Sequence, residues 1–129
     1  AELVEPRLGS ERPEFLYDYP ASQAALAVVR PDDPPVAERF ELYWRGIELC
    51  NGYHELRDPL ELRRRIDVES QRRTGEGLPP LPLPGRFLQA MQSGLPDCAG
   101  VALGFDRLMM LATGAQTVRN VMPFAFEQA

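Results

Sequence analysis

Two carboxylates in the middle of the chain could share a divalent cation if the segment that carries them folds as a hairpin. Residues 37–56 ("AERFELYWRGIELCNGYHEL") are typical of two strands around a turn at Arg45 and Gly46. Counting from that turn makes Glu41 and Glu48 diagonal neighbours on one face of the strand pair. Carboxylate oxygens bind Mg²⁺, most often together with the phosphates of a nucleotide. Spacing alone leaves open whether they hold such an ion or face solvent, and it favours solvent.

A row of polar residues follows on the second of these strands. Asn51, Tyr53 and Glu55 alternate along the chain and therefore share a face. An amide, a phenol and a carboxylate in a row suit a small ligand that carries an amino group, and a mixed polar sheet edge is the competing interpretation. Plain alternation puts this row on the face opposite Glu48. We therefore predict a β-bulge near Cys50 that brings both sets of side chains to one side.

An arginine lies at the join between a glycine-containing strand and an apolar helix in residues 100–111, "GVALGFDRLMML". Gly100 and Gly104 would let another group approach the strand backbone closely. Arg107, in the first turn of the expected helix, could stack on a purine or bind phosphate oxygens. The alternative is a buried salt bridge with Asp106 or with a carboxylate elsewhere. The glycine spacing is not a dinucleotide-binding fingerprint, because the third glycine is missing and no βαβ unit follows.

The elements that must position these residues indicate an α+β fold. A tight turn joins neighbouring strands, so the sheet should be mainly antiparallel, with helices flanking it. Asp58 before Pro59 is typical of a helix N-terminus. We expect strands at 14–20, 37–44, 47–56 and 101–105, and helices from 59 to the glycines at 75 and 77, at 85–94 and at 106–113, with a short helix after residue 20.

The composition restricts the class of function. The net charge of −5 argues against a general electrostatic attraction to nucleic acid. The sequence shows neither an apolar run long enough to span a bilayer nor a basic-then-apolar leader, and its two isolated cysteines, Cys50 and Cys98, suit a reducing cytoplasm. His54 is the single histidine, which excludes a multi-histidine metal site within this chain. We expect His54 to be a surface or hydrogen-bonded residue.

Three blocks of the sequence resemble class II aminoacyl-tRNA synthetases of the lysyl branch, in the order that the family has them. "FLYDYPASQAALA" and "ERFELYWRGIELCNGYHELRDP" resemble the segments before motif 3, and "GVALGFDRLMMLATGAQTVRNVMPF" resembles motif 3 itself. The resemblance covers nearly the whole chain. It implies the class II catalytic fold. It also favours Glu41 and Glu48 as ligands of a metal ion over the interpretation in which they merely face solvent.

The resemblance implies a role for each candidate residue. Arg107 matches the motif 3 arginine that contacts ATP, which makes it the candidate catalytic residue, with Gly104 beside the nucleotide. Glu41 and Glu48 match the carboxylates that hold Mg²⁺ with ATP. Glu55 would face the cationic end of a lysine substrate. The residues that would line the amino-acid pocket are Asn51, Tyr53, Glu55, Gly100 and Ala102.

Details within the branch resemble the elongation factor P lysine ligases more than the synthetases that charge tRNA. "YPASQAALA" and "GLPDCAGVALG" have the form of the ligases, and Ala102 stands where ordinary lysyl synthetases commonly have glycine. A methyl group added beside a bound amino acid shifts the binding preference between its isomers by about 1–3 kcal/mol. The resemblance implies that ATP activates lysine, preferably β-lysine, and that elongation factor P accepts it. A lysyl-tRNA synthetase acting on tRNA and a non-catalytic synthetase-like binding module are the alternatives.

One departure from the family pattern concerns the other two motifs of the class. Residues 1–129 contain motif 3 but no candidate for motif 1 or motif 2, so we interpret them as a single domain, the C-terminal portion of a class II catalytic domain. The motif 2 arginine that aligns the substrate carboxylate with ATP is then missing. We predict that the 129-residue chain alone is inactive and has an exposed apolar surface that favours self-association. We also expect a homodimer for the full-length protein.

Overall fold

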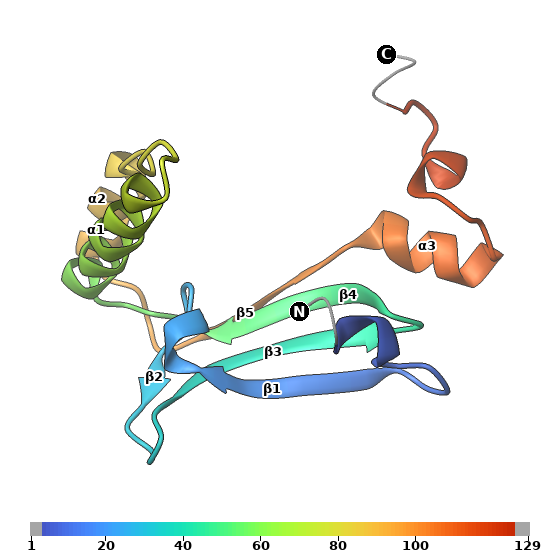
Figure 1. Ribbon diagram of the computed structural model, residues 1–129, viewed down its shortest axis with the longest axis horizontal. Coiled ribbons are helices and arrows are strands. Elements are labelled where there is room, and N and C mark those ends of the chain that lie inside the picture. The colour runs from blue at the N-terminus through green and yellow to red at the C-terminus, as the bar shows by residue number, and fades with distance from the viewer. Residues whose placement is uncertain (1–3, 126–129) are drawn as a thin grey trace. The chain divides into compact units, whose positions relative to one another are not determined.

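The computed structural model describes residues 4–125 and has the predicted α+β architecture (Figure 1). The strands are β1 (Glu14–Pro20), β2 (Val29–Arg30), β3 (Val36–Trp44), β4 (Ile47–His54) and β5 (Ala99–Leu103). The helices are α1 (Pro59–Gly75), α2 (Gly85–Gln92) and α3 (Phe105–Thr113), with short 3-10 turns η1 (Glu5–Arg7), η2 (Ala21–Gln23) and η3 (Val118–Val121). Among these described residues, no helix has the length and apolar character that crossing a bilayer requires.

The strands form a sheet in the order β1-β3-β4-β5, and β2 pairs with the start of β3. That second pairing is antiparallel, with Val29 opposite Ala37. β3 and β4 are joined by Arg45 and Gly46, whose φ angles are +53° and +72°. Two positive φ angles define the turn whose twist matches that of a strand pair. The hairpin and its turn are therefore confirmed.

The segment after β1 and the end of β5 are among the places where the structure differs from the sequence prediction. After β1 the small apolar residues form only the 3-10 turn η2, and Ala27 is fully buried in an antiparallel bridge with Glu55. Buried backbone groups need partners, so pairing with neighbouring strands prevails over local helix preference there. β5 ends two residues earlier than predicted, because Gly104 is the N-cap of α3, which begins at Phe105.

Contacts within the chain divide it into two units, and each is described by itself. Unit 1 comprises Ala1–Asp18, Arg39–Gly52 and Val101–Ala129, and unit 2 comprises Tyr19–Glu38 and Tyr53–Gly100. The buried side chains of unit 1 are Glu41, Tyr43, Leu49, Cys50, Met110 and Ala125. Met110 thus packs in the core of unit 1, as an apolar residue of a half-buried helix should.

Gly9 closes the end of the hairpin in unit 1. Its carbonyl accepts the Arg45 N–H at 2.7 Å, and its own N–H donates to Glu14 Oε2 at 2.9 Å. Its φ is +65°, a conformation that L side chains rarely adopt. A Cβ added there would also lie 2.7 Å from the Cα of Trp44, which is backbone and cannot move aside cheaply.

We expect Gly9→Ala to lower the free energy of unfolding by more than about 2 kcal/mol, since left-handed strain of about 1–2 kcal/mol adds to the backbone clash. Gly77→Ala is the matched control, because Gly77 has φ +77° and no atom within 4 Å of its added Cβ. Thermal denaturation of both variants separates strain from clash. Equal losses in the two variants would show that the clash contributes nothing.

Unit 2 buries a small apolar cluster between two helices. Leu62 of α1 packs with Leu88 and Met91 of α2, and Ile66 is packed against them. The start of α1 is capped as predicted, because the Asp58 carboxylate accepts the Leu60 N–H at 2.8 Å. Leu62 is the buried residue of α1, so the apolar stripe of this helix is narrow, and its packing depends on the cluster with α2.

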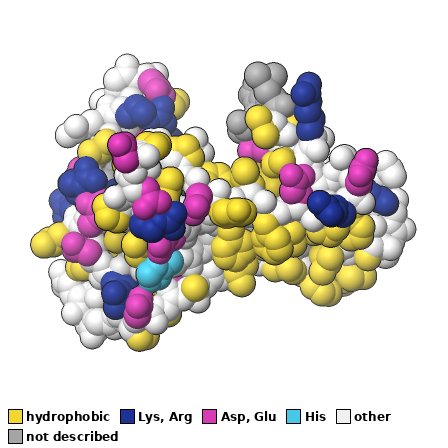
Figure 2. Space-filling view, turned by 90° about the horizontal axis from the view of Figure 1, so that it is seen from below, with side chains coloured by type: hydrophobic (Ala, Val, Ile, Leu, Met, Phe, Trp, Pro, Cys, Tyr) yellow, Lys and Arg dark blue, Asp and Glu magenta, His cyan; other side chains and the backbone are white. Residues whose placement is uncertain are grey.

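Apolar side chains are exposed on the outer strands of unit 1. Phe15 and Tyr17 of β1 are 58% and 68% exposed, and Val101 and Leu103 of β5 are 61% and 50% exposed. Figure 2 shows hydrophobic side chains gathered in a continuous area on the side that it displays. The exposed apolar surface is therefore confirmed, and self-association through it stays a prediction.

Candidate functional site

The candidate metal carboxylate Glu41 is buried in unit 1. It is 5% exposed, and two side chains from its own strand hold it. Its Oε1 accepts a hydrogen bond from Arg39 Nη2, and its Oε2 accepts one from the Tyr43 hydroxyl at 2.5 Å. A buried carboxylate needs a compensating charge, and Arg39 provides it.

The second candidate carboxylate, Glu48, lies beside the candidate catalytic arginine. Arg107 Nη1 donates to the Glu48 backbone carbonyl at 2.8 Å and lies 3.7 Å from Glu48 Oε2. The Arg107 side chain is 50% exposed and that of Glu48 37%. The salt bridge considered for Arg107 is thus present but half in solvent. Both groups keep surface that can meet an incoming phosphate or cation.

A bulge in β4 follows from the hydrogen bonds of two successive carbonyls. The Glu48 carbonyl accepts from Arg107 and the Leu49 carbonyl accepts from the Gly104 N–H, so both are directed toward the same neighbouring segment. A regular strand directs successive carbonyls to opposite edges. In addition, Asn51 accepts from Arg39 Nε at 3.3 Å, whereas regular alternation from the turn would put Asn51 on the other face. These contacts support the bulge predicted near Cys50.

The donor set is suited to Mg²⁺ bound jointly with phosphates. Within residues 4–125 no group of three or more histidine, cysteine, aspartate or glutamate side chains could hold a metal ion. Mg²⁺ commonly uses one or two carboxylates together with substrate phosphates and water, and it does not need a cage made of protein alone. Glu41 and Glu48 fit that requirement, and their joint use of one ion stays a prediction.

In unit 2, the Glu55 carboxylate lies directly over Gly100. A Cβ added at Gly100 would overlap Glu55 Oε1, so the carboxylate could not keep its present position beside a larger residue. The Glu55 N–H donates to the Cys98 carbonyl at 3.0 Å, which ties the carboxylate-bearing residue to the chain entering β5. The close approach expected at Gly100 is therefore confirmed. At Gly104 an added Cβ would meet the Arg107 stem at 3.4 Å, and the approach of a ligand there stays a prediction.

The remaining residues of the predicted amino-acid pocket lie in different units. Asn51 and Ala102 belong to unit 1, where Asn51 binds Arg39 and Ala102 is exposed on β5. Tyr53 belongs to unit 2 and is half-buried. The structure therefore brings together Glu55 with Gly100 and Arg107 with Glu48, and the assembly of the whole pocket stays a prediction.

His54 is held between two carboxylates in unit 2. Its Nε2 lies 2.7 Å from Asp97 Oδ1, and its Nδ1 bonds to Glu38 Oε2. Two acceptors require both ring nitrogens to donate, which only the imidazolium can do. The hydrogen bond with Asp97 and then that with Glu38 raise the pKa of His54 above 6.5. Arg57 lies 3.7 Å from Asp97 and Arg30 lies 3.5 Å from Glu38.

We expect His54→Gln to remove a pH-dependent part of the stability. Since the pKa of His54 is raised by folding, its contribution is complete below the unfolded value of 6.5 and is lost as the pH rises through the folded pKa. The Asp97 pKa is lowered, chiefly by His54, so its contribution is lost as the pH falls through the folded pKa, below 3.8. Melting temperatures of both proteins between pH 5 and 9 should converge at high pH. A difference in melting temperature that stays constant with pH would contradict a protonated His54.

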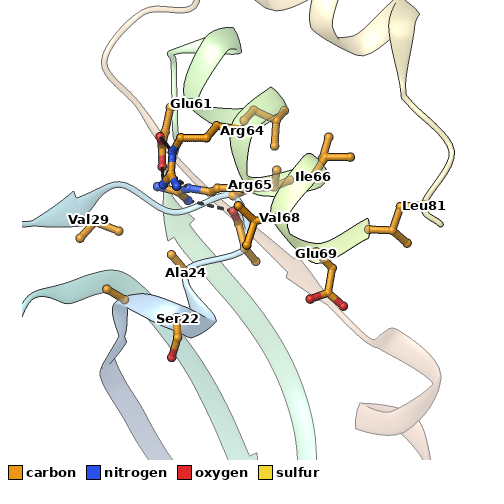
Figure 3. Close-up of a pocket in the computed structure, with 14 residues that line it drawn as sticks. Ser22, Ala24, Val29, Glu61, Arg64, Arg65, Ile66, Val68, Glu69 and Leu81 are labelled. Atoms are coloured by element: carbon orange, nitrogen blue, oxygen red, sulfur yellow. Dashed lines mark hydrogen bonds and ion pairs between the residues drawn. The ribbon is translucent and has the colours of Figure 1, made fainter. Parts of the chain in front are cut away.

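A hollow in unit 2 was not predicted from the sequence. It measures about 630 Å³ and lies between α1 and the segment after β1, with an apolar lining that includes Ala24, Leu26, Val29, Leu62, Ile66 and Val68 (Figure 3). Arg65 spans its rim, donating to the Ala27 carbonyl at 2.8 Å and to Glu61 Oε1 at 2.8 Å. Hydrogen bonds from Arg64 and Arg65 lower the Glu61 pKa to about 2. None of the predicted site residues lines this hollow.

Sequence reasoning missed the side chains that hold the candidates in place. Arg39 and Tyr43 fix Glu41, and Asp97 and Glu38 fix His54. The signal for the first pair was present, because residues two apart on a strand share a face with the glutamate between them. The contact of His54 with Asp97 joins residues 43 positions apart, and no local pattern indicates it.

Comparison with known proteins gives these residues a family context. The model of the class II tRNA synthetases (D, K and N) matches residues 6–128. A protein of Klebsiella pneumoniae (strain 342) named elongation factor P–(R)-β-lysine ligase is 50% identical over 126 residues, which is 98% of this chain. A protein of the same name from Salmonella arizonae is 49% identical over 126 residues.

The chain spans 39% of the length of these two relatives. The match nevertheless runs through every residue of the candidate site, from Glu41 to Arg107, and agrees with the antiparallel sheet and flanking helices. The chain therefore belongs to the family of class II tRNA synthetases that comprises the D, K and N enzymes.

Proposed function

We propose that this chain is part of an ATP-dependent ligase that activates lysine or β-lysine and attaches it to elongation factor P. The observation that carries the proposal is the Glu55 carboxylate over Gly100. Within the described part of the chain, no side chain donates a hydrogen bond or an ion pair to it. A half-buried carboxylate in that state is suited to the ammonium group of a substrate.

The reaction has two steps. A carboxylate oxygen of the amino acid attacks the α-phosphorus of ATP, and pyrophosphate leaves to give the aminoacyl adenylate. The amine of an acceptor lysine on elongation factor P then attacks the activated carbonyl, an amide bond forms, and AMP leaves with the proton passing to solvent. Binding and alignment of the two reactants, rather than a protein nucleophile, would account for most of the acceleration.

Each candidate residue has a role in that scheme. Arg107 neutralises charge on the phosphates as the α-phosphorus becomes five-coordinate. Glu41 and Glu48 would hold Mg²⁺, which polarises the phosphate oxygens when bound. Glu55 binds the substrate ammonium, and Asn51 and Tyr53 are the further amino-acid-binding residues that the family resemblance implies. We assign Ala102 to the choice of lysine isomer and Gly100 to the space that Glu55 needs, while Gly104 stays the expected neighbour of the nucleotide.

The setting of the reaction is also part of the proposal. Cys50 and Cys98 are free thiols, which suits a protein of the reducing cytoplasm. A homodimer is proposed for the full-length gene product on the family resemblance. The 129-residue chain by itself is expected to form no adenylate.

The test identifies the acceptor directly. The full-length gene product is given ATP, Mg²⁺ and labelled lysine or β-lysine, with elongation factor P and tRNA both present. Label on elongation factor P, greater with β-lysine, supports the proposal, and the relatives' names favour this result. Label on tRNA would instead establish a lysyl-tRNA synthetase. No label and no lysine-dependent exchange of pyrophosphate into ATP would establish a binding module.

A further inference from the structure

Arg39 of β3 contacts two residues that the proposed function assigns to different ligands. Its Nε donates to Asn51 Oδ1 at 3.3 Å, and its Nη2 donates to Glu41 Oε1. The side chain is 17% exposed, and all three residues lie in unit 1. One guanidinium therefore touches a predicted lysine-pocket residue on β4 and a predicted metal carboxylate on β3.

The chemistry of arginine sets the orientation of the Asn51 amide. A guanidinium has donors only, so the oxygen of Asn51 must face Arg39 and its NH₂ group is directed elsewhere. The NH₂ group has two donors, which can bind an oxygen of a ligand. Arg39 thereby decides that the NH₂ group of Asn51, rather than its oxygen, is available to a ligand. The amide alone would not determine this orientation.

The same side chain orients Glu41. The carboxylate is buried, with one oxygen bonded to Arg39 and the other to the Tyr43 hydroxyl at 2.5 Å. Two donors on two oxygens fix the plane of the carboxylate. Because the Nε and Nη2 donors belong to one rigid plane, the orientation of Glu41 is coupled to that of Asn51.

We propose that Arg39 is a positioning residue that aligns the amino-acid subsite with the metal subsite through this one guanidinium. The inference rests on the proposed function, because it takes Asn51 and Glu41 to face lysine and Mg²⁺. Arg39 itself touches no substrate. Tyr43 supports the Glu41 side of this arrangement.

Three variants of the full-length gene product test this arrangement. Arg39→Lys keeps the charge that Glu41 needs but loses the planar pair of donors. Tyr43→Phe removes the hydroxyl bond to Glu41. Arg45→Lys is the matched control, because Arg45 lies in the hairpin turn over Trp44 and belongs to neither subsite.

Two measurements separate the subsites. Calorimetry without ATP or metal gives the affinity for lysine, and pyrophosphate exchange at varied Mg²⁺ gives the half-saturating metal concentration. We expect Arg39→Lys to weaken lysine binding about tenfold and to raise the half-saturating Mg²⁺, as the loss of a charge-assisted hydrogen bond would. Tyr43→Phe should raise only the Mg²⁺ requirement, and Arg45→Lys should change neither.

Arg39→Lys with lysine affinity and Mg²⁺ requirement both within twofold of the wild type would overturn the inference. A wild-type protein that binds neither lysine isomer would overturn the proposed function and this inference with it. A second readout does not depend on the folding of any variant. In the wild type, the Arg39 Nε–H resonance should shift when lysine alone is added, and an unmoved resonance would also overturn the inference.

Discussion

Replacement of Arg107 by alanine is expected to lower the rate constant of adenylate formation by about 10²–10³-fold, with a small change in the KM for lysine. Removing one preorganised donor from the charge that develops at a reacting centre costs about that much. The folded protein should lose less than about 1 kcal/mol, because Arg107 is 50% exposed and its pairing with Glu48 at 3.7 Å is a surface contact. Pre-steady-state adenylate formation by the full-length gene product is the measurement.

Arg86→Ala is the matched control, since Arg86 is an exposed residue of α2 outside the candidate site. It should leave the rate unchanged. If Arg107→Ala lowered the melting temperature strongly while the remaining folded enzyme kept its rate, the arginine would serve the contact with the Glu48 carbonyl alone. A selective rise in the KM for lysine would instead indicate that Arg107 acts on lysine and not on the nucleotide.

The second large effect is expected at Gly100. The Gly100→Ala variant places a methyl group where Glu55 Oε1 lies, and the carboxylate, as the end of a flexible side chain, moves aside. We expect the KM for lysine to rise about 10–100-fold, the range for a lost charge-assisted contact, with little change in stability. Steady-state pyrophosphate exchange at varied lysine measures it.

Gly75→Ala is the control for adding a methyl group to a glycine, because an added Cβ there meets nothing within 4 Å. It should leave the KM for lysine unchanged. Glu55→Gln should reproduce the defect of Gly100→Ala, and the double variant should be no worse than either, since both changes remove the same contact. Additive defects would mean that Gly100 acts on the substrate by a route other than Glu55.

Several elements were predictable because their causes are local. The hairpin turn at Arg45 and Gly46 and the N-cap at Asp58 depend on residues within a few positions of each other. The bulge in β4 has another basis, since it was inferred from the need to bring polar residues to one side, and contacts of the Glu48 and Leu49 carbonyls with the distant Arg107 and Gly104 support it. Short-range sterics and hydrogen bonding act before any tertiary contact forms.

Other features had no local cause. Ala27 joins a strand pairing although its neighbours favour helix, and His54 meets Asp97 from 43 positions away. The space at Gly100 is taken by the Glu55 carboxylate, a contact between residues 45 positions apart that no local pattern indicates. Long-range pairing depends on which backbone groups would otherwise be buried unpaired, and a single sequence does not state that.

The sequence by itself determined the chemistry that is available: carboxylates at Glu41, Glu48 and Glu55, a guanidinium at Arg107, and the α+β elements that carry them. Only the tertiary structure decided the state in which each group is held. Glu41 is buried against Arg39, whereas Glu55 has no protein cation beside it within residues 4–125. The reason is physical, since the cost of burying a charge and the choice of its partner depend on surroundings assembled from distant parts of the chain.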